Sequence, residues 1–239
     1  SSCVYTTFAW AMTNLEIEKI PEFDDHEFVA FSAESESGMK SFIAIHNINL
    51  GPAVGGTRYW HYRSEDEALR DALRLSRAMT YKCALARIPY GGGKGVIMAN
   101  RFNPKKRKFL VAYARKINFL KGNFYTGEDV GLMTEHINIL ARHSRYIIGR
   151  QHLAGNPSPW AALGVFYAIR AALGELFGNQ EIARRSFAIK GIGKVGMVLL
   201  GFLYKQGGRL VVADIDQKKM RIAKQKFPKI KLVHPKEIH

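Results

Sequence analysis

Two lysines and one aspartate in the first 130 residues of the chain have side chains that could do chemistry together. Lys82 ends an amphipathic segment, Lys94 follows three glycines, and Asp129 lies just before a glycine turn. As a set, these groups could hold an α-carboxylate, polarise a carbonyl and move a proton. A lysine desolvated beside another cation has a lowered pKa, which suits it to proton transfer near neutral pH. Taken singly, Lys82 is more simply a solvated lysine that stabilises a helix C-terminus.

Glycines surround these residues. Gly55 and Gly56 are adjacent, and Gly91–Gly93 lead directly into Lys94. Glycine weakens a strand and marks places where another backbone or a ligand comes close. The run of three glycines is therefore interpreted as the floor of a binding site rather than as part of a core strand.

A second pattern occurs near the C-terminus. Residues 191–196 read Gly-Ile-Gly-Lys-Val-Gly, which is G-x-G-x-x-G. The pattern follows a predicted strand at 186–190 and opens a predicted helix at 193–206, and Asp214 ends the next predicted strand. This context predicts a dinucleotide-binding turn, whereas the alternative is a glycine-rich turn followed by an N-capping aspartate.

Each position of this turn has an expected task. Gly191 makes the tight turn, Gly193 lets a pyrophosphate approach the helix N-terminus, and Gly196 permits close helix packing. Asp214 would accept hydrogen bonds from the adenosine ribose, and its charge would repel a 2′-phosphate. We therefore expect NAD rather than NADP, although Lys194 beside the phosphate site could blur the preference.

The composition is that of a globular protein with an excess of positive charge. Among 239 residues, 47% are hydrophobic and 23% charged, and the net charge is +16, which favours anionic ligands or surfaces. The basic runs at 101–125 and 217–236 could bind nucleic acid. Their apolar residues recur at helical spacing, which favours solvated helix faces. We expect no nucleic-acid partner.

Several other classes are excluded or disfavoured. The only cysteines are Cys3 and Cys83, which are too few for a disulfide framework or a four-thiolate zinc site, and no metal site is predicted. A cytoplasmic location is expected. Residues 1–11 carry no charge and are interpreted as untargeted. No apolar run reaches about 18 residues, so no membrane-spanning helix is expected.

The first part of the chain predicts an α/β domain with a mixed sheet, largely parallel but with an antiparallel edge. Segments 27–31 and 41–46 form a predicted hairpin around the loop 34–38. Ser64 and Glu67 form a capping box for a helix whose buried face is Ala68, Leu69, Ala72, Leu73 and Leu75. Further elements are expected as strands 96–99 and 123–126 and as helices 105–120 and 134–142.

The second part predicts half of a Rossmann dinucleotide-binding domain. Ser158 is expected to cap a long helix with Pro159 at its first position, and Gly178 to end it. Strands at 186–190, 209–213 and 231–233 then alternate with helices at 193–206 and 216–226. A complete fold of this type needs a second half, so we expect a C-terminally truncated chain. The expected division is 12–150 for the substrate domain, 151–180 for a linker and pivot helix, and 181–239 for the partial NAD-binding domain.

The motifs taken together resemble those of the Glu/Leu/Phe/Val amino-acid dehydrogenases, and the leucine dehydrogenases most closely, over residues 14–239. In order along the chain they are LGPAVGGTR at 50–58, MTYK at 79–82, GGGK at 91–94, EDVG at 128–131, GNPSP at 155–159 and GIGKVG at 191–196.

This resemblance implies a role for each matched position. Lys82 would bind the substrate carboxylate, Lys94 would activate the water and the carbonyl, and Asp129 would shuttle the amine proton. Substrate-binding positions are Val54, Gly55, Gly56, Lys82 and Gly127. Cofactor-binding positions are Asn156, Gly191, Gly193, Lys194, Val195, Gly196 and Asp214.

The implied reaction is NAD-dependent oxidative deamination of an apolar L-amino acid to a 2-oxo acid and ammonia. The reacting site would lie between the domains, and a homo-oligomer without a membrane partner is expected. Because half of the dinucleotide fold is missing, we expect little activity from these 239 residues. The rival hypothesis is an inactive truncated relative that binds nucleotide or polyanions. A different hydride transfer is a third, disfavoured by the paired lysines and Asp129.

Three positions depart from the family pattern. Ala161 replaces a threonine whose hydroxyl would hold the nicotinamide carboxamide. Val54 stands where leucine is common and Gly127 where alanine is common. Removing methyl groups from a pocket wall enlarges the pocket, so we expect a larger apolar or aromatic amino acid as substrate.

Overall fold

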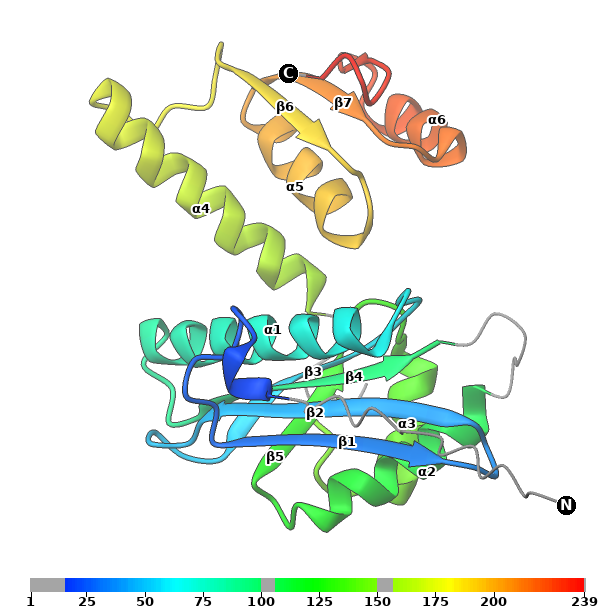
Figure 1. Ribbon diagram of the computed structural model, residues 1–239. Helices are drawn as coiled ribbons and strands as arrows, with labels where there is room; N and C mark the ends of the chain where they lie inside the picture. The colour runs from blue at the N-terminus through cyan, green and yellow to red at the C-terminus, as the bar shows by residue number, and fades with distance from the viewer. Residues whose placement is uncertain (1–15, 100–105, 150–156, 239) are drawn as a thin grey trace, which may run out of the picture. The chain divides into compact units, whose positions relative to one another are not determined.

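The computed structural model describes residues 16–99, 106–149 and 157–238. The chain forms two compact units, Ser1–Ala154 and Gly155–His239. Each unit has its own sheet (Figure 1). The units are described one at a time.

The described residues of the first unit form a mixed five-stranded sheet in the order β1-β2-β4-β3-β5. The expected α/β fold and the hairpin at its edge are confirmed. The sheet is not largely parallel, however, because β2 pairs antiparallel with both β1 and β4, and only β3 pairs parallel with its neighbours β4 and β5. The strands are β1 (Phe28–Glu34), β2 (Met39–Asn47), β3 (Ala53–Trp60), β4 (Gly91–Met98) and β5 (Phe124–Glu128).

Helices cover both faces of this sheet (Figure 1). The helix α1 (Glu65–Leu85) packs on one face, where apolar side chains of the helix and of β2 and β4 form one core. The helices α2 (Lys106–Phe119) and α3 (Thr134–His143) pack on the other face in a second core. A short 3₁₀ turn, Ile17–Lys19, precedes β1.

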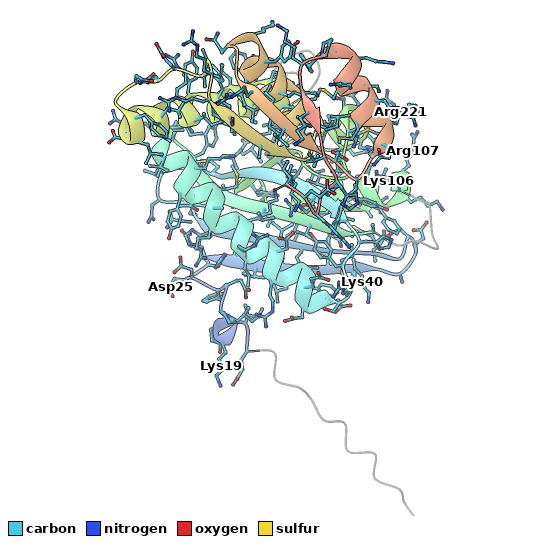
Figure 2. All side chains as sticks on the ribbon, turned by 90° about the horizontal axis from the view of Figure 1, so that it is seen from above. Lys19, Asp25, Lys40, Lys106, Arg107 and Arg221 are labelled. Carbon is cyan, nitrogen blue, oxygen red and sulfur yellow. The ribbon has the colours of Figure 1, made fainter. Side chains whose placement is uncertain are left out.

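The start of α1 is capped largely as its sequence predicts. The Ser64 hydroxyl accepts a hydrogen bond from the Glu67 amide at 3.1 Å. The Glu67 carboxylate instead accepts from the amide of Arg63, at 2.7 Å, so the second half of the expected capping box shifts by one residue. Figure 2 shows Lys40 beside this end of the helix, where it pairs with Glu65.

The buried face of α1 is confirmed at four of the five expected positions. Ala68, Leu69, Ala72 and Leu73 are buried, whereas Leu75 is only half-buried. Ser76 is buried in its place, because it continues the i, i+3, i+4, i+7 face of the helix. Its hydroxyl donates to the Leu73 carbonyl.

The three glycines before Lys94 belong to a core strand, so the expectation that they do not is wrong. Gly91–Gly93 are the first residues of β4, which lies at the centre of the sheet. A Cβ atom on Gly92 would lie 2.1 Å from the Thr80 amide nitrogen of α1. One on Gly93 would lie 2.7 Å from the Phe124 ring. Neighbouring groups approach this backbone so closely that no side chain fits.

The second unit has the predicted alternation of strands and helices. Its strands pair parallel in the order β6-β7-β8. An apolar core joins the strands to the helices, and the rings of Phe166 in α4 and Phe202 in α5 lie 5.7 Å apart. The elements are α4 (Ser158–Phe177), β6 (Ser186–Lys190), α5 (Lys194–Lys205), β7 (Arg209–Ala213), α6 (Gln217–Lys226) and β8 (Lys231–Leu232).

The ends of α4 correct one expectation and confirm another. Pro157 is the N-cap with helical backbone angles, φ −73° and ψ −14°, so Ser158 is the first helical residue and not the cap. Gly178 ends the helix in the left-handed conformation, with φ 69°, as predicted.

The apolar character of α4 bears on the expectation that the chain has no membrane-spanning helix. In the described part of the chain, α4 alone has the length and apolar composition that a membrane span would need. Arg170 and Glu175 interrupt the apolar residues of this helix, so the sequence shows no continuous apolar run there. One such helix is weak evidence, and Phe166 and Leu173 of α4 contribute to the core of the second unit.

Candidate functional site

The structure brings Lys94 and Asp129 into contact. Lys94 lies on the same face of β4 as Gly92, the face that α1 covers, and Asp129 directly follows β5. The Lys94 Nζ and Asp129 Oδ2 atoms are 2.8 Å apart. The Lys94 side chain is 7% exposed and that of Asp129 21% exposed. The two residues predicted to be catalytic therefore form a largely buried ion pair.

Two adjacent glycines of β3 are closely packed, and Gly56 makes room for Asp129. A Cβ atom on Gly56 would lie 2.8 Å from both the Asp129 Cβ atom and the Glu128 carbonyl oxygen. A Cβ atom on Gly55 would lie 1.9 Å from the Gly93 carbonyl oxygen. Close packing thus explains glycine at both positions. Contact of Gly55 and Gly56 with a substrate stays a prediction.

Burial and charge shift the pKa values of both partners. Burial lowers the pKa of Lys94 below its ordinary value and outweighs the opposing attraction of Asp129. Burial would raise the pKa of Asp129, but the charges and hydrogen bonds of Lys94 and Arg58 hold it below its ordinary value. Asp129 is therefore ionised at neutral pH, and Lys94 loses its proton more readily than a solvated lysine does.

Arg58 is the residue that sequence reasoning missed. Its Nε atom donates to Asp129 Oδ2 at 2.9 Å, and its Nη1 atom donates to Asp71 Oδ2 at 2.8 Å. The sequence suggested Lys82 as a second cation near Lys94, but the cation that the structure places there is Arg58. The available signal was its position two residues after Gly56, which puts both residues on one face of a strand.

Lys82 is the remaining cation that the sequence predicts for this site. It is exposed in the last turn of α1, and Lys94 rather than Lys82 contacts Asp129. The turn of α1 that precedes Lys82 covers Gly55, since the Met79 Cγ atom lies 3.2 Å from the position of a Cβ on Gly55. The role of Lys82 in binding a substrate carboxylate stays a prediction.

The two small pocket positions have different surroundings. Val54 is half-buried on β3, opposite Gly92 and Tyr125. A Cβ atom on Gly127 would lie 3.0 Å from the Ile148 carbonyl oxygen and 3.2 Å from its Cγ1 atom. The expectation that the missing methyl group at Gly127 leaves open space is therefore wrong, because Ile148 fills it.

In the second unit, the glycine turn exposes the start of α5. Gly191 has φ +94°, and no atom lies within 4 Å of a Cβ built on Gly191 or on Gly193. A Cβ on Gly196, in contrast, would lie 2.1 Å from the Gly191 carbonyl oxygen. Gly193 caps α5 without a side chain, and Lys194 and Val195 begin the helix. Open backbone amides at a helix N-terminus fit a phosphate group.

Asp214 supports this turn. Its Oδ2 atom accepts a hydrogen bond from the Ile192 amide at 2.7 Å, and its Oδ1 atom accepts from the Asp216 amide at 2.8 Å. These bonds, the one from Asp216 first, hold its pKa below the ordinary value. The N-cap of α6 is Asp216 instead, so the alternative interpretation of Asp214 as a cap is wrong. Contact of Asp214 with a ribose stays a prediction.

Two cofactor-related positions remain. Asn156 lies outside the described residues. Ala161 lies exposed in the first turn of α4, where its amide donates to the Pro157 carbonyl.

Across residues 16–99, 106–149 and 157–238, no group of three histidine, cysteine or acidic side chains could hold a metal ion.

The sequence that holds this site can be compared with known families. The family model of the Glu/Leu/Phe/Val dehydrogenase dimerisation domain matches residues 25–149, which contain Arg58, Asp71, Lys94 and Asp129. The chain belongs to the Glu/Leu/Phe/Val dehydrogenase family. The resemblance inferred from the motifs is thereby confirmed.

Individual relatives extend the match beyond the dimerisation domain. The chain is 40% identical to a leucine dehydrogenase of Geobacillus stearothermophilus over 228 residues, which cover 94% of this chain and 62% of the relative. It is 41% identical to an L-tryptophan dehydrogenase of Nostoc punctiforme over 214 residues, 90% of this chain and 60% of the relative. The crystal structure of L-tryptophan dehydrogenase from Nostoc punctiforme matches with a TM-score of 0.66 at 38% identity, over 90% of this chain and 60% of that one. The chain thus spans about three fifths of the length of these family members.

Proposed function

We propose that this member of the Glu/Leu/Phe/Val dehydrogenase family takes part in the NAD-dependent oxidative deamination of an apolar L-amino acid to its 2-oxo acid and ammonia. The observation that carries the proposal is the buried contact of 2.8 Å between Lys94 Nζ and Asp129 Oδ2. The leucine and tryptophan dehydrogenases similar to this chain support the amino-acid substrate.

Each residue of the pair has a task in this proposal. Lys94, whose pKa is lowered, activates the water that attacks the imine carbon and stabilises the oxygen that develops into the carbonyl. Asp129, which stays ionised, takes a proton from the substrate amine and returns it to the leaving ammonia. Lys82 holds the substrate carboxylate.

The glycine turn at 191–196 is the proposed site for NAD. Its open glycines and the start of α5 would hold the diphosphate, with Asn156 as a further contact predicted from the family. When bound, NAD supplies the acceptor for the hydride from the substrate α-carbon. Asp214 keeps its negative charge beside the turn, which disfavours the 2′-phosphate of NADP. A lower Kd for NADH than for NADPH, measured by fluorescence, tests this choice.

The side chain of the substrate is proposed to be larger than that of leucine. Val54 supports this proposal, whereas Gly127 does not, since Ile148 occupies the neighbouring space. The similarity to an L-tryptophan dehydrogenase is compatible with an aromatic substrate. Values of kcat/KM for valine, leucine, phenylalanine and tryptophan decide the question, and a preference for valine or leucine would refute the larger pocket.

The central test is amino-acid-dependent formation of NADH by the full-length product of the gene, followed by absorbance. Lys94→Ala and Asp129→Asn are expected to lower its rate by orders of magnitude, while Lys40→Ala, which removes an exposed lysine paired with Glu65, leaves it unchanged. Binding of NADH with no turnover of any amino acid, together with salt-dependent retention on heparin, would favour a non-catalytic binding protein instead.

The assembly and location are also proposals. The matched domain is described as a dimerisation domain, which supports a homo-oligomer, and a cytoplasmic enzyme without nucleic-acid or membrane partners fits the expected substrates. Analytical ultracentrifugation of the purified protein tests the oligomer.

A further inference from the structure

We propose that Arg58 positions Asp129 for proton transfer and that Asp71 holds Arg58 in place, which adds two positioning residues to the Lys94–Asp129 pair. That these residues serve deamination rests on the proposed function. The coupling of Asp71 and Arg58 to Asp129 is inferred from the contacts between their side chains.

The arrangement joins four elements of the first unit. Arg58 comes from β3, Asp71 from α1, Lys94 from β4, and Asp129 follows β5. The guanidinium uses Nε for Asp129, at 2.9 Å, and Nη1 for Asp71, at 2.8 Å. A planar guanidinium can bind two acids at fixed angles, which the single charged group of a lysine cannot do.

Both cations contact the same oxygen of Asp129. Lys94 Nζ and Arg58 Nε lie 2.8 Å and 2.9 Å from Oδ2. Two donors on one oxygen fix the plane of the carboxylate and make that oxygen the less basic one. Oδ1 is then the atom that takes the proton from the substrate amine, and Arg58 sets its direction.

Asp71 keeps Arg58 from turning away. Its Oδ2 atom also accepts from the Tyr62 hydroxyl at 2.7 Å, and its Oδ1 atom accepts from Arg74 at 2.7 Å. Burial would raise the pKa of Asp71, but the hydrogen bonds of Tyr62 and Arg74 and the charge of Arg58 hold it below its ordinary value. Asp71 is 13% exposed and ionised, so it is a rigid anchor on α1.

The charge of Arg58 also acts on the proton chemistry. It lowers the pKa of both Lys94 and Asp129, while Asp71 acts on Lys94 in the opposite direction. The charged groups facing Asp129 are thus Lys94 and Arg58, with Asp71 behind Arg58. A residue that served only packing would not be expected to change the pH at which Asp129 titrates.

The decisive experiment compares kcat/KM against pH for the full-length gene product and three variants. Arg58→Gln is expected to lower kcat by about 10- to 100-fold with little change in KM, and to move the acidic limb of the profile to higher pH because Asp129 loses a cation. Arg58→Lys restores the position of that limb but little of the rate, since one ammonium cannot contact both acids. Asp71→Asn gives a smaller loss of kcat.

Arg70→Gln is the matched control. Arg70 lies one residue before Asp71 on α1, and it pairs with Glu22 and Asp66 rather than with the cluster. Its loss is expected to leave kcat and the pH profile unchanged. An unchanged acidic limb in Arg58→Gln, a change in KM alone, or equal effects of Arg70→Gln would overturn the proposal.

A second measurement does not depend on activity. In the 239-residue chain, the ¹³Cγ signal of Asp129, assigned through Asp129→Asn, is followed during a pH titration. Arg58→Gln is expected to shift its midpoint upward, and Arg70→Gln to leave it in place. An upward shift without any deamination would count against the proposed function and leave the coupling standing, whereas an unmoved midpoint overturns the coupling. If Arg58→Gln does not fold, Asp71→Asn takes its place, with a smaller upward shift expected because Arg58 is no longer held against Asp129. Arg58→Lys is expected to keep the midpoint in place, and an unmoved midpoint in Asp71→Asn would overturn the coupling.

Discussion

The two units place their candidate functional groups by different means. In the first unit, charged side chains from four elements hold one another, and the Arg58–Asp129 contact spans 71 positions of sequence. In the second unit, one carboxylate, Asp214, holds backbone amides of Ile192 and Asp216. The difference shows that a site of paired side chains depends on the tertiary fold, whereas a backbone site can be written into a short motif.

Their glycines differ in the same way. Gly56 and Gly92 of the first unit have no room for a methyl group, while Gly191 and Gly193 of the second face open space. Gly56 and Gly92 thus serve internal packing, whereas Gly191 and Gly193 leave backbone open to a ligand. Four predictions test or refine this comparison.

The largest effect is expected at the charged pair. Lys94→Ala should lower kcat of the full-length gene product by about 1,000-fold, because it removes the group that activates water. Gly193→Ala in the other unit should act mainly on the KM for NAD. Steady-state kinetics with varied amino acid and NAD measure both. A similar loss of kcat in the two variants would remove the distinction between the two sites.

A contrast in stability is expected between two glycine substitutions. Gly92→Ala should lower the free energy of unfolding by about 3 kcal/mol, because its methyl group would collide with the backbone of α1. Gly193→Ala should change it by less than about 0.5 kcal/mol, since nothing lies within 4 Å. Urea unfolding followed by circular dichroism gives both values, and equal losses would contradict the assignment of packing to one glycine and openness to the other.

A third prediction concerns the support of the glycine turn. Asp214→Ala should lower the free energy of unfolding of the second unit by about 2 kcal/mol, because two backbone amides lose a charged acceptor. The folded pKa of Asp214 is depressed, so its contribution is present above the ordinary pKa of an aspartate and is lost as pH falls through the folded value. Hydrogen exchange of β6 and β7 at neutral and acid pH measures it, with Asp216→Ala as the control for a helix cap. An equal pH dependence in Asp214→Ala and the unsubstituted chain would exclude this contribution.

The smallest expected effect is a difference between the two units in how their stability depends on pH. His26 of the first unit has a lowered pKa, chiefly because it is buried, with further electrostatic lowering from His46 and Arg77 against the opposing effects of Leu73 and Asp24. The unfolded chain therefore takes up the proton first as pH falls below about 6.5. The first unit then loses at most about 1.4 kcal/mol per pH unit, while the contribution of Asp214 in the second unit is still intact.

His26→Gln is expected to flatten this dependence, and the exposed His61→Gln to leave it unchanged. Hydrogen exchange of β2 against β7 between pH 7 and pH 5 reads the two units separately. Simultaneous loss of protection in both would mean that His26 does not set the acid sensitivity of the first unit.

Much of the fold could be predicted because its signals are local. The hairpin, the capped start of α1, Gly178 at the end of α4 and the alternation of the second unit follow from turn residues and from hydrophobic periods. The strand β4 could not be predicted from its start, because three glycines have no strand propensity. They are tolerated there only since α1 and Phe124 crowd the backbone from both sides.

For the candidate site, the sequence by itself determined the types of residue present: two lysines, an aspartate, and glycines at spacings typical of one family. Only the tertiary structure decided which of them meet. It joined Lys94 to Asp129 and added Arg58 and Asp71. The physical reason is that a buried charge is stable only beside a partner of opposite sign. That partner comes from whichever strand or helix the fold places next to it.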